Sequence, residues 1–88
     1  MTYHAPAHVH FRAVDDEIVL LDTRRDAYFG LNPTGAIAWS ALAAGRSATD
    51  AAADISAQFD VEPAAAGADV VALIEQLVAR GLLEPFAR

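Results

Sequence analysis

In the stretch Ala27-Tyr28-Phe29-Gly30-Leu31-Asn32-Pro33, the pattern of the chain changes from that of a strand to that of a helix. From Ala27 to Leu31, alternate residues fall on opposite faces, and the face that holds Phe29 is apolar, which predicts a strand. Asparagine is a favoured N-cap, and proline suits the first helical position because its missing N–H costs nothing there. We therefore expect the sheet to end at Leu31 and a helix to begin at Pro33.

Two further strands are expected before this stretch. Residues His8–Val14 alternate between two faces, and Glu17–Asp22 is a short β-branched run that suits a strand covered on both faces. Asp15-Asp16 separates these two strands, and a polar turn at residues 23–26 leads into the third strand. Residues 1–6 show no periodic pattern, and we expect them to fray.

Helical signals follow the strands. The first helix is expected to run to about Ala44, because Gly45 fits the position just past a helix end. The stretch Ser47-Ala48-Thr49-Asp50 has the spacing of a capping box and predicts the start of a second helix. Residues 60–63 interrupt that helix.

A third helix is expected to start between residues 63 and 67 and to end near Arg80, with Gly81 as its stop. Its predicted core stripe consists of Val70, Leu73, Ile74, Leu77 and Gly81. Leu82, Leu83 and Phe86 then form an apolar tail suited to an extended segment. Three strands followed by three helices imply an α+β fold, with the helices on one side of an antiparallel sheet.

The composition limits the size of the protein and the functions it can have. The 88 residues suit a single domain, with residues 8–86 as its ordered part. Six basic residues against twelve acidic ones, a net charge of -6, argue against nucleic acid and anionic membranes as partners. The lack of cysteine removes disulfides, thiolate metal sites and cysteine nucleophiles. No secretion signal opens the chain, so we expect a cytoplasmic protein.

Several of these residues together resemble a known family. Leu21-Asp22 is followed by Arg25–Gly35, which reads Arg-Asp-Ala-Tyr-Phe-Gly-Leu-Asn-Pro-Thr-Gly, and by Trp39 on the first helix. With the pattern of residues 77–83, they resemble the PQQ-synthesis protein D family, which provides recognition elements for ribosomally made precursor peptides. Within that family, Tyr28–Gly35 is most similar to the stand-alone leader-binding proteins of lasso-peptide clusters.

The resemblance implies a winged-helix-like fold with a three-stranded antiparallel sheet followed by three helices. It also implies that the leader of a precursor peptide pairs as an extra strand with the third strand. The leader would lie in the groove between that strand and the third helix. The lasso version would pass it to a separate cysteine-protease-like leader peptidase, with the lasso cyclase as a further partner. The resemblance assigns the module no catalysis and no cofactor.

Two features of the residues themselves agree with this implication. Asp26–Leu31 is the best candidate for an open edge, because the chain leaves the sheet after it and an unpaired edge can template another chain. The third helix also has an apolar arc wider than a core stripe needs, because Val71 and Val78 extend it. The expected peptide-binding residues are Asp26, Ala27, Tyr28, Phe29, Gly30, Leu31, Val70, Val71, Ile74 and Val78.

Other readings of the sequence stay open. A peptide carrier for a radical enzyme is the alternative within the same family. A winged-helix DNA-binding regulator is disfavoured, because residues 50–59 carry no Lys or Arg to meet phosphates. A small toxin–antitoxin or structural partner is a third class. His4, His8 and His10 invite a metal reading, but a pair on one strand face makes a poor site, so we expect solvated histidines and no metal.

Overall fold

The computed structural model describes residues 1–86, and the last two residues of the expected domain lie outside this range. The three main strands precede the three helices, which confirms the predicted order and the α+β class. The elements are β1 (Tyr3–His4), β2 (Val9–Val14), β3 (Glu17–Asp22), β4 (Ala27–Leu31), α1 (Pro33–Ala43), α2 (Ala48–Gln58), α3 (Pro63–Ala79) and β5 (Glu84–Pro85).

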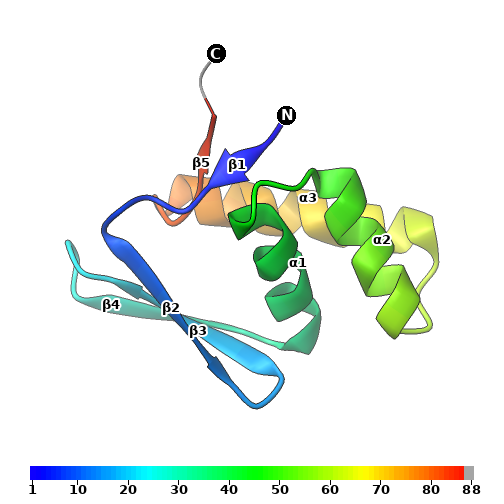
Figure 1. Ribbon diagram of the computed structural model, residues 1–88, viewed down its shortest axis with the longest axis horizontal. Coiled ribbons are helices and arrows are strands. Elements are labelled where there is room, and N and C mark those ends of the chain that lie inside the picture. The colour runs from blue at the N-terminus through cyan, green and yellow to red at the C-terminus, as the bar shows by residue number, and fades with distance from the viewer. Residues whose placement is uncertain (87–88) are drawn as a thin grey trace.

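The main sheet is antiparallel, with the strand order β2-β3-β4. Its two turns contain Asp15 and Asp26 with φ of 57° and 52°, a left-handed conformation that aspartate tolerates better than most residues. All three helices lie on one side of this sheet (Figure 1). The expectation that β3 is covered on both faces was therefore wrong. Ile18 and Leu20 are buried toward the helices, whereas the opposite face holds the partly exposed Val19 and Leu21.

The helix boundaries follow the predicted caps. The Asn32 side chain accepts a hydrogen bond from the Gly35 backbone N–H at 2.8 Å, so the first turn of α1 is capped. Ser47 and Asp50 form the predicted capping box at the start of α2. Within residues 1–86, no helix combines the length and apolarity needed to cross a membrane.

The core lies between the helices and the helix-facing side of the sheet, and α1 is its central element. Trp39 and Leu42 on α1 are fully buried, as is Leu20 on β3. Helix α3 contributes Ala66, Val70, Ile74 and Leu77. The segment after α3 adds Leu82 and Leu83. This placement agrees with the predicted packing of the apolar tail, although Phe86 remains about half exposed.

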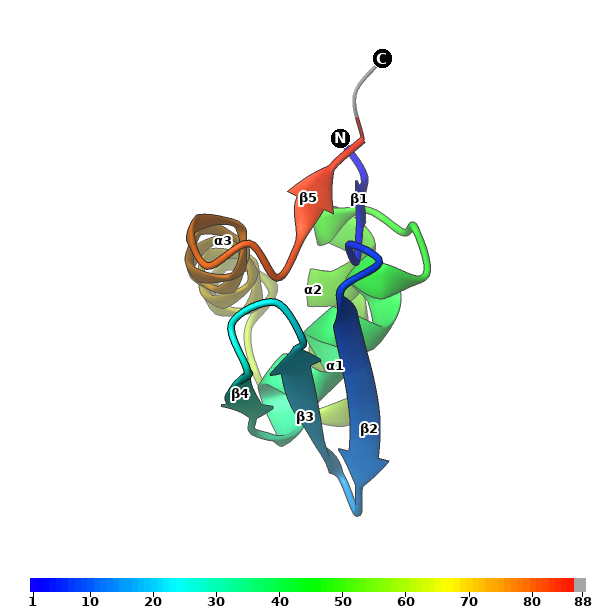
Figure 2. The same cartoon turned by 90° about the vertical axis from the view of Figure 1, so that its left-hand side faces the viewer.

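The ends of the chain contradict the expectation that residues 1–6 fray. Strand β1 pairs with β5 in a small antiparallel sheet, and the Phe86 N–H donates to the Thr2 carbonyl at 3.0 Å. Strands β1 and β5 lie side by side in Figures 1 and 2. A pairing of two-residue strands so far apart in sequence leaves no periodic signal, which is why the sequence did not indicate it.

The two neighbouring positions Leu77 and Val78 test this account of the core. Leu77 is completely buried, whereas Val78 is 39% exposed. Replacing Leu77 by alanine should lower the free energy of unfolding by about 2–4 kcal/mol, through lost apolar burial and a residual cavity. Val78→Ala should cost less than about 1 kcal/mol. Urea denaturation of both variants measures the difference, and equal losses would contradict the assigned helix face.

Candidate functional site

Strand β4 forms one edge of the main sheet. No strand within residues 1–86 pairs with its outer side. A five-residue edge of this kind presents unpaired N–H and C=O groups that another extended chain can use. Strand β2 forms the other edge, so openness alone does not distinguish the two. The hollows and side chains beside β4 distinguish it from β2.

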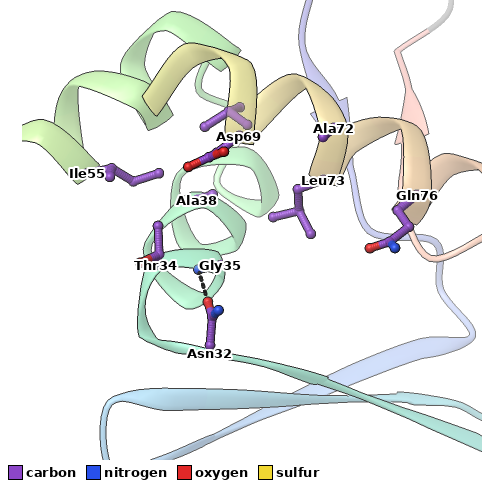
Figure 3. A pocket seen from close by; sticks show the side chains of 10 residues that line it. Asn32, Thr34, Gly35, Ala38, Ile55, Asp69, Ala72, Leu73 and Gln76 are labelled. Atoms are coloured by element: carbon purple, nitrogen blue, oxygen red, sulfur yellow. Dashed lines mark hydrogen bonds between the residues drawn. The ribbon is translucent and has the colours of Figure 1, made fainter. Parts of the chain in front are cut away.

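A hollow of about 430 Å³ opens between the beginning of α1, α2 and one side of α3, and Asn32, which lines it, directly follows the last residue of β4. Asn32, Thr34 and Gly35 line it from the start of α1, and Asp69, Leu73 and Gln76 line it from α3. Figure 3 shows Leu73 and Gln76 projecting from α3 toward the start of α1 and the strand before it. In Figure 2, α3 and β4 lie on the same side of the molecule. An extended chain added to β4 would therefore run past this side of α3.

A smaller hollow of about 110 Å³ lies at the other end of β4. Ala27, Tyr28 and Phe29 line it from the strand, and Arg80 and Leu82 line it from the segment that follows α3. The Arg80 guanidinium carbon lies 4.9 Å from the centre of the Phe29 ring, a favourable cation–π distance. We call these two hollows, together with the outer edge of β4, the β4 groove.

Arg25 ties the two walls of the groove together. Its side chain donates a hydrogen bond to the Arg80 carbonyl at the end of α3. It also lies 3.5 Å from the carboxylate of Asp22, which is buried and accepts bonds from the backbone N–H groups of Arg24 and Arg25. A cation at the C-terminal end of a helix is favourable because the helix dipole is negative there. The contact fixes the spacing between the turn before β4 and α3.

The expected strand residues take different places in the structure. Ala27 and Phe29 line the groove, but Leu31 is buried in the core at 5% exposure. Tyr28 also borders the smaller hollow, although its side chain points to the opposite face of the sheet from Phe29 and is 73% exposed. Gly30 is exposed on that same face. Asp26 lies in the turn just before β4 and outside the strand.

The expected helix residues divide between the core and the far side of α3. Val70 and Ile74 are buried in the core, although Val70 also reaches the floor of the larger hollow. Val71 lines a different hollow, between α2 and α3, with Ala52 and Gly67. Val78 follows Val71 by seven residues and so falls on the same side of the helix. The structure does not bring Val71 and Val78 together with β4.

The groove instead contains residues that the sequence did not single out for binding. Leu73 was assigned to the core stripe, and the structure leaves it partly exposed in the larger hollow. Asp69, Gln76 and Arg80 share its side of α3, since they stand four, three and seven positions away. Periodicity finds the apolar stripe of a helix, but it does not tell which flank of that stripe faces the strand edge.

The histidines do not assemble a metal site. No group of three or more potential metal ligands occurs among residues 1–86. His8 departs from the expectation of a solvated side chain, because its ring is 14% exposed and lies 3.9 Å from the Asp22 carboxylate. Spacing along the chain does not indicate this pairing, since β2 and β3 must first fold together to create it.

Comparisons with known proteins agree with this geometry. The sequence matches the family described as coenzyme PQQ synthesis protein D (PqqD) over residues 17–83. The chain belongs to the PqqD family. This confirms the assignment suggested by Tyr28–Gly35. No curated protein matches the sequence.

Two solved structures are similar to this PqqD-family chain over nearly its whole length. One is TbiB1 in complex with the TbiA(beta) leader peptide, with 29% identity, a TM-score of 0.85, and coverage of 97% of this chain and 99% of that one. The other is a lasso peptide synthetase B1 complexed with the leader peptide. It has 29% identity, a TM-score of 0.86, and coverage of 97% and 100%.

Gly81 and Gly67 form a matched pair that tests the backbone conformation assigned to the end of α3. Gly81 has φ of +73°, and a methyl group there would lie 3.3 Å from an Arg25 Nη atom. Gly81→Ala should therefore lower the free energy of unfolding by about 1–2 kcal/mol. Gly67 lies inside α3 with nothing within 4 Å of its would-be Cβ, so Gly67→Ala should raise it by about 0.5–1 kcal/mol. Thermal denaturation gives the sign of each change in the free energy of unfolding. A Gly81→Ala variant as stable as the parent would contradict the left-handed conformation of Gly81.

Proposed function

We propose that this protein binds the leader segment of a ribosomally made precursor peptide in lasso-peptide maturation, by addition of the leader as a strand to β4. The observation that carries the proposal is the open edge of β4 beside a groove walled by α3. The two similar structures support it, because each is a complex with a leader peptide and matches this chain from end to end.

Strand addition separates affinity from specificity. The five residues of β4 offer main-chain hydrogen bonds that any extended peptide can make. Each bond contributes about 0.5–1.5 kcal/mol net, which is partly offset by the entropy lost when the peptide becomes ordered. Alternate side chains of the peptide would then point into the groove, where Phe29 and Leu73 provide apolar contact. The choice of leader would depend on these contacts.

The protein is proposed to act as a binding module without catalysis or cofactor. Its partners would be the leader, a cysteine-protease-like leader peptidase that receives the bound leader, and the lasso cyclase. The site of action would be the cytoplasm, where precursor peptides are made. A carrier role beside a radical enzyme is favoured only by the family description, which concerns PQQ synthesis. The lasso role has two complexes in its favour.

The first test is hydrogen exchange on the protein with and without the leader encoded by a neighbouring precursor gene. Strand pairing should slow exchange of the outward-facing amides of Ala27–Leu31, because they gain partners. The amides of β2 should not change. A scrambled leader of the same composition is the control. Slowed exchange at Val9–Val14 would instead place the peptide on the other sheet edge and refute the proposal.

The second test distinguishes the two sides of α3. Leu73→Ala should weaken leader binding about tenfold, because one apolar wall of the groove loses contact area. Val78→Ala should change the affinity less than about twofold, because Val78 lies on the other side of the core stripe. Calorimetric titration of both variants, each verified as folded by circular dichroism, gives the comparison. A larger loss from Val78→Ala would assign the groove to the side that the sequence suggested.

A further inference from the structure

The β4 groove carries charges that main-chain pairing does not use. At the end near Ala27 stand the guanidinium groups of Arg25 and Arg80 and the buried carboxylate of Asp22. Asp22 is compensated by Arg25 at 3.5 Å. Arg80 forms no ion pair with any carboxylate among residues 1–86. One positive charge is thus left over at this end, in a chain whose net charge is -6.

The larger hollow at the other end of the groove carries a negative charge. Asp69 lines the larger hollow at its α2 side, near Ile55 and Thr34, and Leu73 lies one turn further along α3. No ion pair neutralises Asp69 within residues 1–86. A peptide lying along β4 would therefore meet a cation near Ala27, and a side chain that entered the larger hollow would meet an anion. This difference gives the groove a direction that backbone pairing alone does not supply.

Arg80 is positioned to meet a bound side chain. Its exposed side chain extends over the ring of Phe29, which stands on the groove face of β4. The ring holds the guanidinium beside the path of an added strand. Guanidinium also suits carboxylate, because its planar set of donors matches the two oxygens. The guanidinium is exposed, so its N–H groups can donate to a bound side chain.

We propose that the bound peptide carries an acidic side chain opposite Ala27, paired with Arg80, and an apolar side chain opposite Leu31 in the hollow beside Leu73. This inference rests on the proposed strand addition to β4. Because side chains of a strand share a face at every second residue, and each residue advances about 3.4 Å, the two positions are about four residues apart. Asp69 disfavours the reversed placement by repelling a carboxylate at its end.

A library of random twelve-residue peptides displayed on phage tests the inference without knowledge of the natural leader. Selection on the full chain should enrich Asp or Glu at one position and an apolar residue about four positions away. Selection on Arg80→Gln should lose the acidic preference and keep the apolar one. Arg80→Lys should keep both, because it retains the charge. Arg46→Gln is the control. Arg46 precedes α2 and pairs with Asp54 in the middle of that helix, away from the groove.

A double-mutant cycle on one enriched peptide measures the pair directly. Replacing the peptide's acid by its amide, or Arg80 by glutamine, should each weaken binding about fivefold, and the two changes together should cost no more than one. Peptides that protect the Ala27–Leu31 amides yet show no acidic preference would overturn the charge pairing and leave the proposed function intact. If none of the selected peptides protects the amides of β4, both the charge pairing and the proposed function are overturned.

Discussion

The chain switches from strand to helix at Asn32-Pro33, and this switch determines where α1, α3 and the open edge of β4 lie. Proline has no N–H to give to a sheet, and the Asn32 side chain binds the Gly35 N–H that begins the helix. The chain must therefore leave the sheet after Leu31. Helix α1 packs against the sheet, and α3 packs mainly against α2, with its C-terminal end beside β4. The edge of β4 is left open beside α3 as a consequence of this order.

An open edge is a liability unless its access is restricted, because it pairs with any extended chain. Here the strand has only five residues, and one wall of the groove is held by Arg25 between Asp22 and the end of α3. Leu73 lies next to the buried Leu77 stripe and yet remains partly exposed. The wall of the groove is thus an extension of the core, so its shape is maintained by the same packing that stabilises the fold.

The sequence predicted those parts of the fold that depend on local chemistry. The caps at Asn32 and Ser47 and the core position of Leu77 all follow from spacing within one element, and the structure confirms them. The family motif identified β4 as the edge of interest. What the sequence could not supply was the rotation of α3 about its axis relative to β4, which depends on packing against α1 and α2. For that reason the sequence favoured Val71 and Val78, and it did not single out Arg80, which the structure places over the Phe29 ring. The pairing of β1 with β5 was missed because it depends on contacts between opposite ends of the chain.

The uncovered face of the sheet gives the proposed binding mode a further consequence. Side chains of an added strand alternate between two faces, so half of them would enter the groove and half would stand beside Tyr28 and Gly30. No helix within residues 1–86 covers that second face, and Val19 and Leu21 are partly exposed there. A bound leader would therefore be held by one row of side chains while the other row remained accessible. Under the proposed function, this arrangement would let an enzyme recognise the leader while it stays bound, which enclosure of the peptide on both faces would prevent.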